Sequence, residues 1–155
     1  MTRTDATQQA LAPLDLDAAV ARYERVILRI AKDKRIRRRS AERRFREMLK
    51  FLDLCATSSQ TIAPPPKVDD AWHAFVLFTR AYADYCELRF GFFIHHDPTE
   101  TRDKEAYARA YEMATSRFNP PDRRVWDVPY AGAGFWGSCG GGGCGGGGCG
   151  GGGGC

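Results

Sequence analysis

The C-terminal end of the sequence is built from glycine and cysteine alone. Residues 139–155 hold four cysteines, separated by runs of four, four and five glycines. Ordering a glycine backbone costs about 1 to 2 kcal/mol per residue, and this segment has no apolar side chain whose burial could offset that cost. We therefore predict a disordered tail over residues 139–155, attached to a domain that folds from the residues before it.

Apolar residues before the tail recur every three to four positions, which is the period of an amphipathic helix. Cap and breaker residues then divide the pattern into predicted helices over about 17–34, 40–56, 68–90 and from Asp97–Pro98 to Phe118. We predict an all-α fold, a small bundle of about four helices, over residues 15–118. A flexible N-terminus over residues 1–14 precedes it.

The segment between the last predicted helix and the tail is apolar but irregular. Residues 119–138 contain two tryptophans, Trp126 and Trp136, together with prolines and glycines that interrupt any regular pattern. We expect this segment, called the strap below, to lie across the helical domain without forming a helix or a strand.

The N-terminal residues contain no apolar run typical of a signal peptide, and no later run reaches the roughly 20 apolar residues that span a bilayer. These features predict a cytoplasmic protein. Because the cytoplasm keeps thiols reduced, the six cysteines are interpreted as candidates for metal binding or chemistry. A disulfide framework is the minor alternative.

All three histidines lie around the predicted third helix: His73 within it, and His95 and His96 just after it. Asp69 precedes His73 by four residues and so shares its helical face, where a carboxylate could bind a metal ion or orient an imidazole. These four residues form a candidate metal site, and a purely structural role is the alternative. Adjacent histidines point in different directions, so at most one of His95 and His96 is expected to face a shared site.

The tail thiols form the second candidate metal site, with Cys139, Cys144, Cys149 and Cys155 as ligands. Four thiolates complete a tetrahedral zinc site and also suit Cu(I). A different chemistry also fits, because the segment resembles the Gly- and Cys-rich peptides of thiazole-modified microcins, in which a cysteine thiol attacks the preceding carbonyl. A plain spacer is the third interpretation.

Cys86 falls in line with Trp72 on the predicted helix and is predicted to be a core residue.

The segment from Lys32 to Arg46 is strongly basic, with nine of its fifteen residues Lys or Arg. It lacks interleaved exposed aromatic residues and any recognition-helix pattern, so a solvated helix face is favoured over nucleic-acid binding. A protein-interaction module that displays this face or the strap remains an alternative function. The sequence has no Gly-rich phosphate loop, no G-x-S-x-G and no H-E-x-x-H, so a non-enzymatic protein is predicted.

The run from Phe51 to Pro98 resembles the signature block of the glycine-rich domain-containing protein-like family, a group with bacterial and plant members. The matching parts are Val68, Asp69, Trp72, His73, Phe75, Tyr82, Cys86, Gly91, His95, His96 and Pro98. Many relatives have W-H-x-H where this chain has Phe75 in place of the second histidine, which weakens a metal site built on that pair. The resemblance implies a Gly-rich extension after the helical block and no established enzymatic activity.

Overall fold

The computed structural model describes residues 11–97, 103–118 and 120–129. The described part contains helices and no strands, which confirms the predicted all-α class. It has six helices in place of the four predicted: α1 (Leu16–Arg22), α2 (Glu24–Lys34), α3 (Arg38–Thr57), α4 (Pro66–Val76), α5 (Thr79–Phe90) and α6 (Lys104–Phe118).

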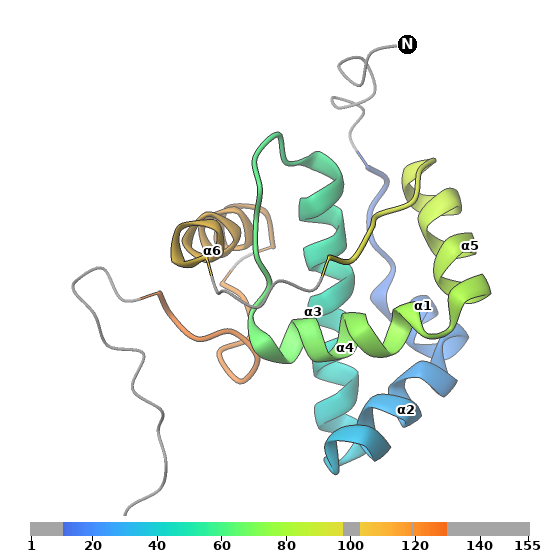
Figure 1. Ribbon diagram of the computed structural model, residues 1–155. Coiled ribbons are helices and arrows are strands. Elements are labelled where there is room, and N and C mark those ends of the chain that lie inside the picture. The colour runs from blue at the N-terminus through green and yellow to red at the C-terminus, as the bar shows by residue number, and fades with distance from the viewer. Residues whose placement is uncertain (1–10, 98–102, 119, 130–155) are drawn as a thin grey trace, which may run out of the picture.

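Helix α3 forms the centre of the domain (Figure 1). Its apolar residues at helical spacing, such as Phe45, Met48 and Leu52, are fully buried, because α1, α2, α4 and α6 all pack against it. Helix α5 packs on α4 and lies to one side of α3, whereas α6 lies on the other side (Figure 1). The predicted helix over 40–56 therefore exists and is the core element.

The helix predicted over 17–34 is divided at Tyr23 into α1 and α2, although the sequence has no glycine or proline there. Tyr23 leaves the helical conformation, with φ −108° and ψ 29°. Its ring packs against Phe45, Phe75 and Tyr85, with centroid distances of 6.1, 5.0 and 5.9 Å. Packing of this ring in the core accompanies the break, which local sequence does not signal.

The helix predicted over 68–90 is likewise divided, at Leu77 and Phe78, into α4 and α5. Phe78 has φ −87° and ψ 62°, and Tyr82 N–H donates to its carbonyl, so a new helix starts there. The single helix predicted over 68–90 is therefore wrong, and the buried residues of α5 are Tyr82, Tyr85 and Cys86.

The last predicted helix is present as α6. It begins at Lys104, where the Asp103 carboxylate accepts from the N–H groups of Glu105 and Ala106, both at 3.0 Å. The predicted start at Pro98 lies outside the described residues. The proline-containing loop after α3 runs beside α6, and Ala63 N–H donates to the carbonyl of Ala106 at 3.2 Å.

The described part of the strap, residues 120–129, contains turns and no helix or strand. It is held on the domain by Trp126, whose side chain is 1% exposed and whose Nε1–H donates to Glu47 Oε2 at 2.9 Å. The Tyr107 hydroxyl donates to the carbonyl of Asp127, and Lys67 Nζ donates to that of Arg124 at 2.9 Å. Three separate elements thus hold the strap.

The two ends of the chain extend beyond the described residues, and the predicted disordered tail at 139–155 lies outside them. Residues 11–14 of the predicted flexible N-terminus are described. Leu14 packs against the core, and the Ala12 carbonyl accepts from Arg89 Nη2 at 3.1 Å, so this part lies against the domain. Within the described ranges, no helix is long and apolar enough to cross a membrane.

Candidate functional site

Two of the predicted site residues lie on α4, which starts at a run of prolines. Pro66 occupies the first helical position, where its missing N–H costs no hydrogen bond. Asp69 follows in the first turn, where the positive end of the helix dipole favours a carboxylate. His73 comes one turn later and is exposed. The shared helical face predicted from their spacing is therefore present.

The other two histidines lie in the segment that follows α5. Gly91 ends α5 in the left-handed conformation, with φ 73°, which only glycine adopts without strain. The chain then returns toward α3 and α4 (Figure 1) and buries Ile94, which is 8% exposed. His95 and His96 follow directly, so the burial of Ile94 fixes where they lie.

His96 contacts both predicted partners on α4. Its Nε2 lies 2.9 Å from Asp69 Oδ1, and its ring centroid lies 5.8 Å from that of His73. The ring also packs edge-on against Trp72 at 4.4 Å. The side chain of His96 is 7% exposed, whereas that of Asp69 is 50% exposed. The structure thus brings Asp69, His73 and His96 together.

His95 contacts a different residue. Its ring lies 4.9 Å from that of Phe93, and the residue is exposed. The four tail cysteines of the second predicted site lie outside the described residues. Among residues 11–97, 103–118 and 120–129, no three His, Cys, Asp or Glu side chains are arranged to hold a metal ion. In the described domain, the predicted histidine site is therefore a close His–Asp pair with one further histidine beside it.

A buried hydrogen-bond chain connects the elements that carry Asp69 and His96. The spacing of residues in the sequence does not predict this chain. Trp72 Nε1–H donates to the Tyr82 hydroxyl at 2.8 Å, and that hydroxyl donates to the carbonyl of Ile94 at 2.7 Å. Burial raises the pKa of Tyr82 far above its ordinary value, so the hydroxyl keeps its proton. The chain joins α4, α5 and the segment that carries His96. The feature of the sequence that could have indicated this chain is that Trp72 and Tyr82 both occur in the run from Phe51 to Pro98 that carries the family resemblance.

A family model described as UCP032817-like matches residues 21–120, which is more than half of the chain. The chain belongs to the UCP032817-like family. The matched range contains α2 to α6 and, with them, the pair of Asp69 and His96; it ends before the Gly–Cys tail. No curated protein and no solved structure matches the chain.

Both cysteines inside the UCP032817-like region have protonated thiols at neutral pH. Cys86 is fully buried, as predicted, although the argument from one continuous helix does not hold. Burial raises the pKa of its thiol, opposed by hydrogen bonds with Ile94 and Tyr82. Cys55 is half-buried, and burial of its thiol raises the pKa to about 12. Neither is disulfide-bonded. Thiolate chemistry at these two positions is disfavoured.

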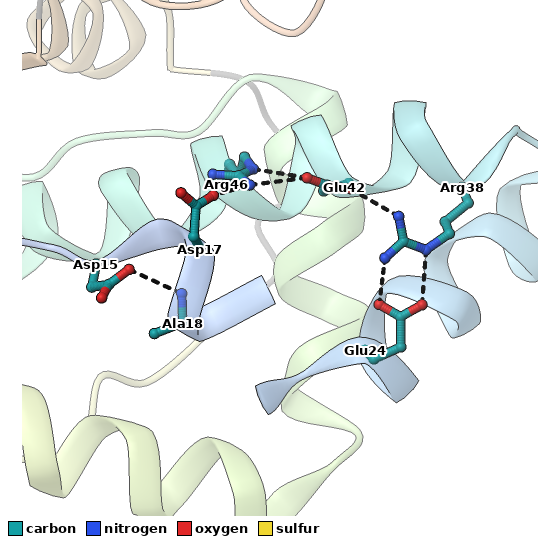
Figure 2. Close-up of polar contacts among 7 residues, drawn as sticks. All are labelled: Asp15, Asp17, Ala18, Glu24, Arg38, Glu42 and Arg46. Atoms are coloured by element: carbon teal, nitrogen blue, oxygen red, sulfur yellow. Dashed lines mark hydrogen bonds and ion pairs between the residues drawn. The ribbon is translucent and has the colours of Figure 1, made fainter. Parts of the chain in front are cut away.

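The basic segment Lys32–Arg46 serves mainly to connect helices. Arg38 binds Glu24 and Glu42, and Arg46 binds Glu42 and Asp17, so one cluster ties α1, α2 and α3 together (Figure 2). Further ion pairs join Lys34 and Arg44 to Asp70, and Arg43 to Asp122. Five of the nine basic side chains are therefore paired with carboxylates within the described structure.

Proposed function

We propose that this chain is a non-enzymatic protein that binds a soft or transition metal ion, zinc or copper, through the thiolates of Cys139, Cys144, Cys149 and Cys155. The observation that supports this most directly is the state of the other two cysteines. Burial keeps Cys55 and Cys86 protonated, since it raises the pKa of both thiols. The other four cysteines lie in the tail. Their sequence neighbours are mostly glycines, which have no side chain that could bury a thiol.

The energetics favour this assignment. Closing loops of four or five residues costs on the order of 1 to 2 kcal/mol each plus a constant, whereas zinc binding to unfolded thiol peptides contributes roughly 10 to 16 kcal/mol. Four thiolates satisfy the tetrahedral preference of zinc, and Cu(I) also prefers thiolate ligands. Glycine linkers permit the backbone angles that such closely spaced ligands require.

His73 and His96, with Asp69 as the carboxylate that orients His96, are proposed as a second, weaker and incomplete site for the same kind of ion, and the His95 ring contacts Phe93 instead. Support comes from the 2.9 Å contact between His96 and Asp69 and from the adjacent His73 ring. A carboxylate next to a metal-binding imidazole commonly orients the ring and fixes its tautomer. In this role the helical domain contributes two nitrogen ligands at most, which is fewer than the four of a closed zinc site.

The test is the metal content of the full-length protein purified under reducing conditions. We expect about one zinc or copper ion per chain by elemental analysis, because four thiolates complete one site. Replacement of all four tail cysteines by serine should remove this ion. The matched control, with Cys55→Ala and Cys86→Ala, should retain it. Equal metal in the tail variant and the wild type would contradict the proposal.

The intact mass of the protein from its native host tests the alternative that the tail is a modified precursor. Each thiazole removes one water molecule and two hydrogen atoms, so up to four rings give a distinct set of masses. The metal proposal predicts the unmodified mass and four tail thiols that react with an alkylating agent after the metal is removed. Membership of the glycine-rich domain-containing protein-like family remains a prediction from resemblance.

A further inference from the structure

The domain contains a cavity of about 780 Å³ beside the pair of Asp69 and His96. Its lining residues come from the loop after α3, the start of α4, the segment after α5 and the start of α6. Its size falls within the range of roughly 300 to 1,000 Å³ typical of small-molecule sites. The apolar part of its lining includes Ile62, Pro64, Trp72, Ile94 and Tyr107.

The charged residues that line this cavity are mostly acidic. They are Asp69, Asp70, Asp97 and Asp103, and among the described lining residues Lys104 is the one Lys or Arg side chain. Asp70 is neutralised by Lys34, whose Nζ lies 2.5 Å from Oδ1, and by Arg44 at 3.1 Å. Asp103 accepts the first N–H groups of α6 through one oxygen. Among the described lining residues, Asp69, Asp97 and Asp103 therefore outnumber the one lysine, Lys104.

His96 holds the Asp69 side chain at the edge of the cavity. Nε2 of His96 lies 2.9 Å from Asp69 Oδ1. The His96 side chain is 7% exposed, whereas the Asp69 side chain is 50% exposed. The imidazole thus orients a carboxylate that remains accessible.

We propose that this cavity binds a small organic cation, an ammonium or guanidinium group carried on an apolar or aromatic body. The apolar walls match the body, because burial of apolar area contributes about 25 cal/mol per Å². A cation taken out of water needs an opposite charge, which Asp69 and Asp97 provide. Trp72 and Tyr107 also belong to the lining, and aromatic rings attract cations. The same carboxylates repel an anion of equal size.

A titration of three matched probes tests this proposal on the full-length, reduced protein. The probes are 2-phenylethylammonium, 2-phenylethanol and phenylacetate, which share a ring and differ in charge. The indole N–H signal of Trp72 in a nitrogen–proton NMR spectrum reports on the cavity wall. We expect saturable binding of the ammonium probe, at least tenfold tighter than binding of the other two. Equal affinity for all three, or no saturable shift up to millimolar concentration, would overturn the proposal.

Two single substitutions locate the binding within the molecule. Asp97→Asn removes a cavity carboxylate and leaves the Asp69–His96 contact in place. It should weaken binding of the ammonium probe about three- to tenfold. Asp84→Asn is the control, since Asp84 is an exposed aspartate of α5 that does not line the cavity. An equal loss in both variants would show a general charge effect and contradict the site. The readout is Trp72, in the helical domain, and the protein is freed of metal before the titration, so the outcome does not depend on either proposed metal site.

Discussion

The cysteines of the helical domain and those of the tail differ in their surroundings. Cys55 and Cys86 lie in a domain where aromatic and aliphatic side chains surround them, and burial raises the pKa of both thiols. Each tail cysteine has glycine as its neighbour on both sides, apart from Ser138 before Cys139 and the end of the given sequence at Cys155. The same residue type therefore occurs in two different surroundings along this chain.

This difference changes how the total of six cysteines is interpreted. A thiol whose pKa is about 12 is a thiolate in fewer than about one molecule in ten thousand at pH 7.5, whereas an unperturbed cysteine with a pKa near 8.5 is about one-tenth thiolate. Metal ions and electrophiles react with thiolates. Four of the six cysteines are thus the candidates for metal binding, and they follow one another at the C-terminal end.

The largest expected effect is the contrast in alkylation rate between the two sets. At pH 7.5, with metal removed, iodoacetamide should label the tail at least about 10³-fold faster than Cys55, because the thiolate fractions differ by that factor. Tryptic peptides 51–67, 81–89 and 125–155 separate Cys55, Cys86 and the tail for mass spectrometry. Labelling of all six cysteines at similar rates would contradict the difference in thiol reactivity between the tail and the helical domain.

A second prediction destabilises the domain alone. Trp126→Ala should lower the free energy of unfolding by about 3 to 5 kcal/mol, because it empties a buried site and leaves Glu47 without its indole donor. Urea denaturation measures the change. Cys55 and Cys86 should then react faster at a given urea concentration, while the tail rate stays the same. Val128→Ala, at a position of the strap that is 60% exposed, is the control and should change stability by less than about 0.5 kcal/mol.

A third prediction concerns pH. Because the folded-state pKa of Cys55 is raised from 9.0 to about 12, the folded protein retains a proton that the unfolded chain loses above pH 9. Stability from this group is therefore complete below pH 9 and falls by up to about 1.4 kcal/mol per pH unit between pH 9 and pH 12. Cys55→Ala should show a shallower decline than the wild type in the same denaturation series. Parallel curves would contradict the burial assigned to this thiol.

A smaller effect is expected from Tyr82→Phe. The substitution leaves the buried Trp72 N–H and the Ile94 carbonyl without their common partner, which should cost about 1 to 3 kcal/mol. Alkylation of Cys86 should accelerate by roughly 5- to 150-fold if opening of the domain limits the reaction. Leu88→Ala on the same helix, where Leu88 is 73% exposed, is the control, and a similar acceleration in both variants would argue against the hydrogen-bond chain.

The helical class followed from the spacing of apolar residues, because each helix of the domain buries one face. The breaks at Tyr23 and at Leu77–Phe78 could not be predicted, since no glycine or proline occurs at either place. At Tyr23 the break coincides with insertion of its ring among three aromatic partners from α3, α4 and α5. Such tertiary contacts override local preference, and single-sequence patterns do not contain them.

The candidate site was predictable in part. The four-residue spacing of Asp69 and His73 placed them on one face of a helix, which the structure has. Which of His95 and His96 would meet them depended on the turn after Gly91 and on the burial of Ile94. The cavity beside Asp69 is formed by four separate elements, so no local pattern of residues indicates it.

Protection of the tail thiols by metal tests the central claim most directly. The reduced, metal-free protein is incubated with one equivalent of Zn²⁺, treated briefly with iodoacetamide and digested, and the adducts on peptide 125–155 are counted by mass. We predict four adducts without zinc and none or few with zinc, while Cys55 and Cys86 remain largely unlabelled in both samples. Four tail adducts formed at the same rate with and without zinc would contradict metal binding by the tail.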